Sequence, residues 1–297
     1  MKTTMFHGDG FLPFVGLGTC NLGTTEEELI RILNTALDVG YRLFDTANGY
    51  NNESGIGKFL HHLPIPRSEV FITSKLNDNL HSYTAASSAV DETLNRLHTE
   101  YLDLFLIHNP NSQMMRESMK NEYEKDHNYW IKANIETWQA LEECVIKGKI
   151  KNIGVSNFEI RHIEALLPHI KIKPLINQIK YCVGCYGTQE RLIEYCKQKG
   201  ILIQGYSPFG KGNAVNIPQI QDIAARLDCG AKDVILSYLR KKGIPTIIKA
   251  SCHTHLISNL HPHYVVLTDD DIRIIESCVI KENWAKIKNP DTGEKYN

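Results

Sequence analysis

The stretch VGLGTCNLGTTEEELIRILNTALDV, residues 15–39, contains the pattern that decides the fold. A short apolar run ends in a polar residue, a loop follows, and the chain then takes on helical periodicity. Thr25 with Glu28 predicts a capping box at the start of this helix, and Gly40 suits the position just past its end. Apolar residues also recur at i, i+4, i+7 and i+8, which is one face of a helix: Leu29, Leu33, Ala36 and Leu37.

The same alternation of an apolar run and a helical segment continues along the chain. Further strands are predicted where apolar runs end at or near Asp45, Lys75, His108, Asn157, Gln178, Tyr206 and Lys249. Helices are predicted over residues 51–62, 85–97, 135–147, 160–167, 189–199, 232–242 and 268–279. Such alternation implies parallel strands, because parallel strands need crossover connections.

Eight such units in 297 residues favour a closed (β/α)8 TIM barrel with extra helices, as a single domain over residues 1–297. No glycine-rich dinucleotide fingerprint follows a strand, which disfavours an open Rossmann sheet. A long polar loop is predicted after the fourth strand, over residues 109–134, and a polar tail over residues 281–297. The loop is either a surface insertion with a helical turn or a cover over the substrate.

The composition is that of an ordinary globular protein with a net charge of −1, which gives no sign of a nucleic-acid-binding surface. Neither the N-terminus nor the longest apolar runs, such as residues 102–107, predict a secretory signal or a membrane span. The eight cysteines are too few for a disulfide framework and are expected to be reduced thiols. We therefore expect a cytoplasmic protein, a monomer or weak homodimer, that acts on a small molecule.

Three successive predicted strands end in Asp45, Lys75 and His108. Polar residues at the carboxyl ends of barrel strands line the active site, whereas those at the other end are mostly structural. A charge at the end of an apolar strand is costly unless it is paired or exposed to water. The pattern therefore favours a paired constellation, and three separate residues at a solvated rim are the alternative.

Five stretches in this order resemble the signatures of the aldo-keto reductase family, and the likeness runs from about residue 15 to residue 259. They are GYRLFDTANGYNNE (40–53), ITSKL (72–76), DLFLIHNP (103–110), IGVSNF (153–158) and YSPFG (206–210). The resemblance implies the same barrel and an NAD(P)H-dependent reduction of an aldehyde or ketone to an alcohol. It makes Tyr50 the general acid, with Lys75 stabilising its phenolate and Asp45 orienting Lys75. His108 would donate a hydrogen bond to the carbonyl oxygen.

The hydride must come from a cofactor, since no side chain supplies one. The resemblance implies that Ser156, Asn157 and Gln178 bind the nicotinamide carboxamide and that Tyr206 stacks on its ring. The full set of cofactor residues that it implies is Thr19, Asp45, Ser156, Asn157, Gln178, Tyr206, Ser207, Lys249, Ala250, Ser251, His255 and Asn259.

The adenosine end departs from the family's pattern. Ala250 stands where serine is usual, and His255 falls where an arginine grips the 2′-phosphate. A neutral histidine is a weak substitute for a bidentate guanidinium. Lys249, Ser251 and the helix start near Thr254 can still bind a phosphate. We expect NADPH, with NADH as the alternative.

The substrate pocket departs as well, because Cys20 and Asn109 stand where the family often has tryptophan. The pocket is expected to be wider and more polar than a slot for hydrophobic aldehydes, with Tyr129, Trp130 or Trp284 rebuilding part of it. The substrate-binding residues are predicted to be Cys20, Tyr50, His108, Asn109 and Trp130.

Metal chemistry is not expected. Glu53 and Asp45 do not make the carboxylate cluster that magnesium needs. Cys182 and Cys185 form a CxxC, which can serve redox or metal chemistry, but no second pair follows at zinc spacing. We interpret this CxxC as a coincidence.

Two other functions remain open. A strand-end lysine in a barrel also suits a Schiff-base aldolase or lyase, in which Lys75 would attack the carbonyl. Some members of this fold family are cofactor-binding regulatory subunits, and fold alone does not establish activity. The ordered set of Tyr50, Ser156, Asn157 and Gln178 argues against both.

Overall fold

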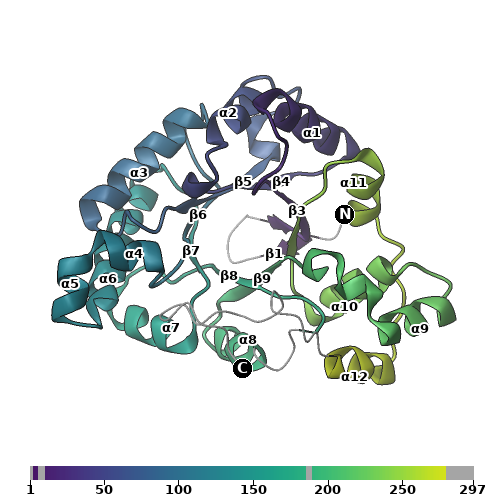
Figure 1. Ribbon diagram of the computed structural model, residues 1–297. Coiled ribbons are helices and arrows are strands. Elements are labelled where there is room, and N and C mark those ends of the chain that lie inside the picture. Colours follow the sequence, from purple (N-terminus) through teal and green to yellow (C-terminus); the bar gives the residue numbers. More distant parts are fainter. Residues whose placement is uncertain (1–2, 6–10, 185–188, 279–297) are drawn as a thin grey trace.

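The computed structural model describes residues 3–5, 11–184 and 189–278, and within them eight parallel strands close into a barrel (Figure 1). The order around the barrel is β10-β3-β4-β5-β6-β7-β8-β9, so the last strand closes on the first. The predicted fold is confirmed, and every predicted run overlaps one of these strands. The strands are β3 Val15–Gly18, β4 Leu43–Asp45, β5 Phe71–Leu76, β6 Leu104–Ile107, β7 Ile153–Ser156, β8 Ile176–Lys180, β9 Leu202–Tyr206 and β10 Thr246–Ile248.

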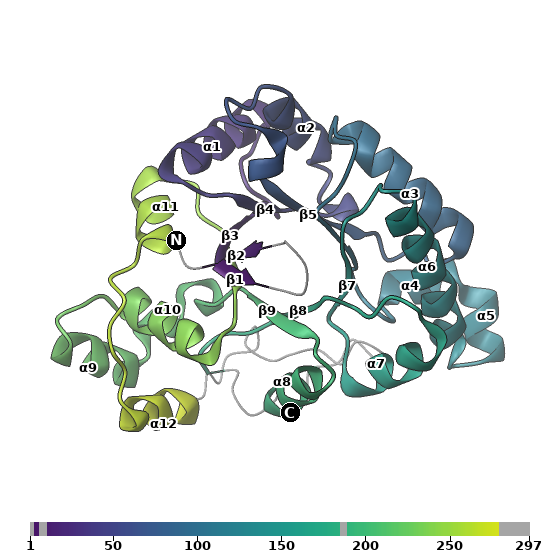
Figure 2. The same ribbon diagram turned by 180° about the vertical axis from the view of Figure 1, so that it is seen from behind.

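Helices surround the barrel in both views (Figures 1 and 2). Those that correspond to predicted segments are α1 Glu26–Val39, α2 Glu53–His61, α3 Tyr83–Arg96, α6 Tyr129–Ile146, α7 Ile160–Leu166, α8 Glu190–Gln198, α10 Ala231–Lys242 and α12 Asp269–Ser277. The helix α9, Pro218–Arg226, was not predicted, and α11, His253–Leu260, begins at the helix start that was predicted near Thr254. Thr25 caps α1 by accepting a hydrogen bond from the amide of Glu28, and Gly40 ends it at φ 112°. The Glu28 carboxylate accepts from Thr24 rather than from Thr25, so the predicted capping box is only half formed.

The strands alternate between two cores. On β6, Leu104 and Leu106 point into the barrel, whereas Phe105 and Ile107 belong to the larger core between the barrel and the helices. This period of two follows from the pleat of a strand. It also places His108, the next residue in the series, on the side of the barrel interior. The same alternation on β4, where Leu43 points inward and Phe44 outward, brings Asp45 to the inside.

A short antiparallel hairpin of β1, Thr3–Met5, and β2, Phe11–Pro13, lies across the barrel opening (Figure 2). Leu12 is fully buried against residues at the beginnings of barrel strands, including Leu43, Leu104 and Ile176. The hairpin therefore covers the amino-terminal end of the barrel. It was not predicted.

The connection after β6 is more helical than predicted. Residues 109–134 contain α4, Gln113–Ser118, α5, Lys120–Lys125, and the first turns of α6, so the expectation of a long loop is corrected. Its apolar residues form a small cluster of their own, in which Met115, Tyr129, Trp130 and Ala133 are buried. These buried side chains pack the connection together.

No helix within residues 3–5, 11–184 and 189–278 is long and apolar enough to cross a membrane. Cys182 is disulfide-bonded, so the expectation of reduced thiols is wrong at this position. The free cysteines are Cys20, Cys144, Cys196, Cys229, Cys252 and Cys278. Cys185, Trp284 and the predicted tail over residues 281–297 lie outside the described residues.

Candidate active site

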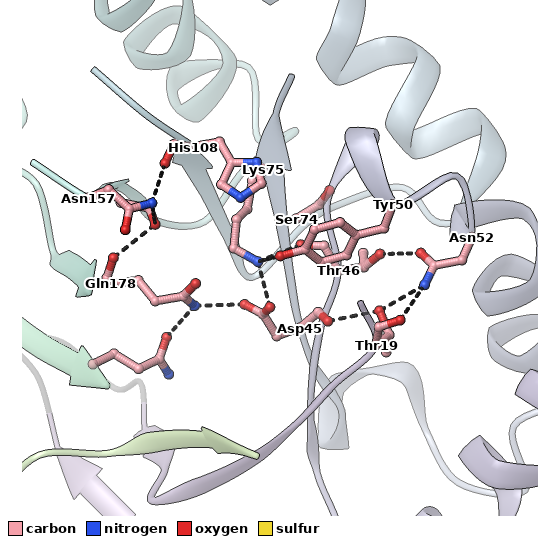
Figure 3. A network of polar contacts seen from close by, with 12 residues as sticks. Thr19, Asp45, Thr46, Tyr50, Asn52, Ser74, Lys75, His108, Asn157 and Gln178 are labelled. Carbon is pink, nitrogen blue, oxygen red and sulfur yellow. Dashed lines mark hydrogen bonds and ion pairs between the residues drawn. The ribbon is translucent and has the colours of Figure 1, made fainter. Parts of the chain in front are cut away.

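Lys75 is the centre of a polar network at the carboxyl end of the barrel (Figure 3). Its side chain is 1% exposed, and its ammonium donates three hydrogen bonds. The acceptors are Oδ1 of Asp45 at 2.5 Å, the carbonyl oxygen of Thr46 at 2.9 Å and Oη of Tyr50 at 3.4 Å. An ammonium has three N–H groups, so all three are used. The structure thus brings together Asp45, Lys75 and Tyr50, as the sequence predicted.

Asp45 is held from the other side of the barrel. Gln178, on β8, donates from Nε2 to Oδ2 of Asp45 at 2.7 Å and to Oε1 of Gln204 at 2.9 Å. The amide and hydroxyl of Thr19 both donate to the backbone carbonyl of Asp45 at 3.0 Å. Both carboxylate oxygens of Asp45 therefore have charged or amide partners, which is what a buried charge requires.

Tyr50 lies at the end of a single 3₁₀ turn, η1, Asn48–Tyr50, which follows β4. Asn52 fixes the chain just beyond this turn, because it accepts from the hydroxyl of Thr46 at 2.6 Å and donates to the carbonyl of Thr19 at 2.8 Å. Burial raises the pKa of Tyr50 well above its usual value, and the negative charge of Asp45 adds to the effect. The ammonium of Lys75 alone would lower the pKa of Tyr50, so the shift has the opposite direction. The phenol therefore keeps its proton at neutral pH.

His108 lies against Tyr50, with the ring centroids 5.8 Å apart in an edge-to-face arrangement. Burial lowers the pKa of His108 to about 3, and the positive charge of Lys75 contributes. The imidazole is therefore neutral at physiological pH and carries one N–H donor. Its backbone is fixed by Asn157, which donates to the carbonyl of His108 at 3.0 Å.

Glu53 has a structural role. Its carboxylate accepts from the hydroxyl of Ser74 at 2.6 Å and from Nε of Arg96 at 2.8 Å, and so ties α2 to β5 and α3. No cluster of three or more His, Cys, Asp or Glu side chains that suits a metal occurs among the residues that the structure describes.

The residues predicted for the nicotinamide end lie at the carboxyl ends of neighbouring strands. Ser156 ends β7 and donates to the carbonyl of Gln178 at 2.8 Å. Tyr206 ends β9, and its hydroxyl donates to Oδ1 of Asn157 at 2.9 Å. Asn157 and Ser207 both adopt positive φ, near 60°, where the chain turns away from its strand. One mouth of the barrel thus holds this set together with the residues predicted to be catalytic.

The residues predicted for the adenosine end surround the start of α11. Lys249, Ser251 and His255 are exposed, whereas Ala250 is buried. Cys252 occupies the N-cap position without a side-chain cap, so the first amides of this helix are open to an anion. Asn259 is buried, and its Oδ1 has no hydrogen-bond partner. A buried acceptor without a donor fits a ligand that supplies one, such as an adenine amino group.

The predicted substrate residues separate into two groups. Cys20 is exposed and close enough for its charge to influence Tyr50, and Asn109 is bonded to Asp78. Trp130 instead packs within the helical layer, with its ring 4.8 Å from that of His162, so its role as a substrate contact stays a prediction.

Several members of the network were not predicted from the sequence. Gln204 was overlooked within an apolar run, although a polar residue in an inward position beside Gln178 is a detectable signal. Thr46 and Asn52 lie within the signature over residues 40–53, which does not indicate that they bond to each other. Asp78, in the loop after β5, carried no signal, because nothing in the sequence places it beside Asn109.

Comparisons with known proteins agree with this geometry. A family model described as the aldo/keto reductase family matches residues 15–280. Glyoxal reductase of Bacillus subtilis is 32% identical over 289 residues, which covers 97% of this chain and 96% of that protein. The NADPH-dependent D-xylose reductase of Meyerozyma guilliermondii is 34% identical, with 94% of each chain covered. The apo crystal structure of Gox0644 matches with a TM-score of 0.82 at 30% identity over 98% of each chain. A mutant of the same protein, solved in complex with NADPH, matches with a TM-score of 0.80 at 30% identity over 94% of each chain.

Proposed function

The chain belongs to the aldo/keto reductase family and is an oxidoreductase, and we propose that it reduces an aldehyde or ketone with NADPH while Tyr50 protonates the carbonyl oxygen. The observation that carries this proposal is the contact of one ammonium, that of Lys75, with both Asp45 and the phenol oxygen of Tyr50. A general acid must hold its proton until charge develops on its substrate and must then release it. The surroundings of Tyr50 meet both conditions.

The proton stays on Tyr50 in the resting enzyme because burial disfavours the phenolate. When negative charge develops on the carbonyl oxygen, the O–H bond of Tyr50 breaks and the proton moves to that oxygen. The phenolate that is left accepts the hydrogen bond of Lys75, which is fixed by Asp45 and the carbonyl of Thr46. A donor that is already in place costs no reorganisation during the reaction.

His108 binds and orients the carbonyl group. Since its pKa is near 3, it acts as a neutral donor and not as a second acid. Its ring lies edge-to-face with Tyr50, which places both donors on the same side of the mouth. The carbonyl oxygen would receive hydrogen bonds from Tyr50 and His108 together.

The chain has the residues to hold NADPH, which supplies the hydride to the carbonyl carbon when bound. Ser156, Asn157, Gln178 and Tyr206 would hold the nicotinamide end. The orphaned acceptor of Asn259 and the uncapped start of α11 fit the adenosine end. Related proteins support the choice of NADPH, since the Meyerozyma guilliermondii reductase is named NADPH-dependent and the Gox0644 mutant was solved with NADPH.

A Schiff-base function for Lys75 is disfavoured by the same three hydrogen bonds. A Schiff base requires a neutral amine with a free lone pair, whereas this nitrogen donates to three acceptors and is paired with Asp45. The regulatory-subunit alternative is disfavoured because the complete network that would support turnover is assembled.

The proposal is tested by following the loss of reduced nicotinamide absorbance with a panel of aldehydes and ketones. Tyr50→Phe is expected to lower kcat by about 10²–10⁴-fold and to leave NADPH binding, measured by fluorescence, intact. Tyr195→Phe, on α8, is the matched control and is expected to behave as wild type. Full activity of Tyr50→Phe would overturn the proposed role of this residue.

A further inference from the structure

Beside the proposed catalytic residues lies a polar pair formed by Asp78 and Asn109. Asn109 directly follows His108, and Asp78 lies in the loop after β5. The side-chain amide of Asn109 donates to both carboxylate oxygens of Asp78, at 3.1 and 2.9 Å. Because β5 and β6 are neighbouring parallel strands, the two loops leave the barrel at the same mouth.

Asn109 is itself held in place by the network of the site. Nδ2 of Asn157 donates to Oδ1 of Asn109 at 3.0 Å and to the carbonyl of His108 at 3.0 Å. The amide oxygen of Asn109 thus accepts from Asn157 while its nitrogen donates to Asp78. This arrangement fixes the orientation of the amide and holds the Asp78 carboxylate in one position.

The loop that carries Asp78 also packs on the turn that carries Tyr50. A Cβ atom built on Gly49 would lie only 3.3 Å from Oδ1 of Asn77, so the residue before Tyr50 contacts the residue before Asp78. The same Asn77 oxygen accepts a hydrogen bond from the amide of Asp78 at 3.0 Å. In agreement with this packing, the charge of Asp78 contributes to the raised pKa of Tyr50.

Asp78 is partly buried but has only neutral partners. Among the described residues its hydrogen bonds come from Asn109 and Ser112, and no ion pair with a basic side chain is present. Burial raises the pKa of Asp78, while these two hydrogen bonds lower it. A carboxylate has about four acceptor sites, so it retains capacity for a further donor. A ligand that displaces water from this carboxylate without donating a hydrogen bond to it binds less favourably, because the carboxylate is then desolvated without compensation.

We propose that Asp78 determines substrate preference by accepting a hydrogen bond from a hydroxyl group close to the carbonyl of the substrate. The favoured substrates are then hydroxylated aldehydes or ketones. An unsubstituted alkyl aldehyde leaves the carboxylate unpaired, and a substrate with its own carboxylate is repelled. The inference rests on the proposed carbonyl reduction and names its substrate class.

The test compares kcat/KM for matched aldehydes with NADPH. Wild type is expected to favour glyceraldehyde over propanal, and butanal over succinate semialdehyde, each by about 10- to 100-fold. Asp78→Ala is expected to bring both ratios close to one. Asp78→Asn keeps the shape and one acceptor oxygen, so it should raise the relative rate with succinate semialdehyde and reduce the glyceraldehyde preference only in part.

Both kcat/KM values in a ratio are measured with the same variant. The ratio therefore does not depend on the fraction of active enzyme or on the affinity for the cofactor. If Asp78→Ala does not fold, Asp78→Asn carries the test. Asp222→Asn, an exposed position on α9, is the matched control and should keep the wild-type ratios. Unchanged ratios in an active Asp78→Ala or Asp78→Asn enzyme would overturn the inference alone. Failure of wild type to reduce any of the aldehydes would overturn the proposed function and, with it, this inference.

Discussion

Nε2 of Gln178, on β8, donates a hydrogen bond of 2.7 Å to Oδ2 of Asp45, on β4. The two strands are not neighbours in the barrel, so this bond crosses its interior. The other carboxylate oxygen of Asp45 holds Lys75. A residue assigned to the cofactor therefore shares one carboxylate with the proposed proton-donating pair, and a change at either end should be felt at the other.

Removal of the Asp45 charge should destabilise the protein as well as stop the reaction. Asp45→Asn leaves the ammonium of Lys75 buried without its counter-charge, which costs about 3 kcal/mol or more of unfolding free energy. Urea unfolding measures this loss. Asp270→Asn, which breaks an exposed ion pair with Arg273, should cost less than about 1 kcal/mol. An Asp45→Asn protein as stable as wild type would contradict the assigned burial of this pair.

The activity should be independent of His108 ionisation near neutral pH. Because the pKa of His108 is about 3 and that of Tyr50 is raised, neither group titrates between about pH 5.5 and 8.5. A profile of kcat/KM at saturating NADPH should therefore show no transition near pH 6.5 that belongs to this residue. His108→Gln should lower the whole profile without changing its shape. A transition in wild type that disappears in His108→Gln would show that the imidazole ionises.

Stability should fall as the pH drops below about 6.5, because three histidines resist protonation in the folded protein. Burial lowers the pKa of His81 to about 4 and those of His108 and His162 to about 3. Below about pH 6.5 the unfolded chain binds protons that the folded chain does not. The free energy of unfolding then decreases by up to about 1.4 kcal/mol per pH unit for each histidine, until the folded pKa is reached.

The measurement is urea unfolding between about pH 6.5 and 5, above the usual range of carboxylates. His81→Leu or His162→Leu should make the dependence on pH shallower. His127→Gln, at an exposed position, should not change the slope. An equal slope in all variants would mean that these histidines are protonated in the folded protein.

Cofactor preference should depend on His255, which is exposed in the first turn of α11. His255→Arg places a bidentate cation where a 2′-phosphate would bind, so the ratio of NADPH to NADH affinity should rise by about 10-fold. Fluorescence titration with both cofactors gives this ratio. His263→Arg adds the same charge at another exposed position and should leave the ratio unchanged. If both variants raise the ratio equally, general charge rather than His255 is responsible.

The strand ends were predictable because two independent constraints meet there. An apolar run that ends in Asp, Lys or His identifies both a buried strand and a residue that faces the mouth, and Asp45, Lys75 and His108 obey this rule. The helix caps at Thr25 and Gly40 were predictable for the same reason, since each rests on local backbone chemistry.

Contacts between loops could not be predicted in this way. The bond between Asp78 and Asn109 joins residues 31 positions apart, and its existence depends on how two irregular segments fold back over the mouth. The connection over residues 109–134 looked irregular because its charges hide the short helices α4 and α5.

The order of functional residues along the chain has a consequence for how the protein can change. Asp45, Tyr50, Lys75, Asp78, His108 and Asn109 all precede residue 110, whereas the residues assigned to the cofactor, apart from Thr19 and Asp45, begin at Ser156. If these assignments hold, substrate choice and cofactor choice are encoded in separate portions of one gene. Recombination between relatives near α6 would exchange one trait and leave the other largely intact. The hydrogen bond from Gln178 to Asp45 joins the two portions. A recombined chain would therefore need residues at these two positions that can still form this bond.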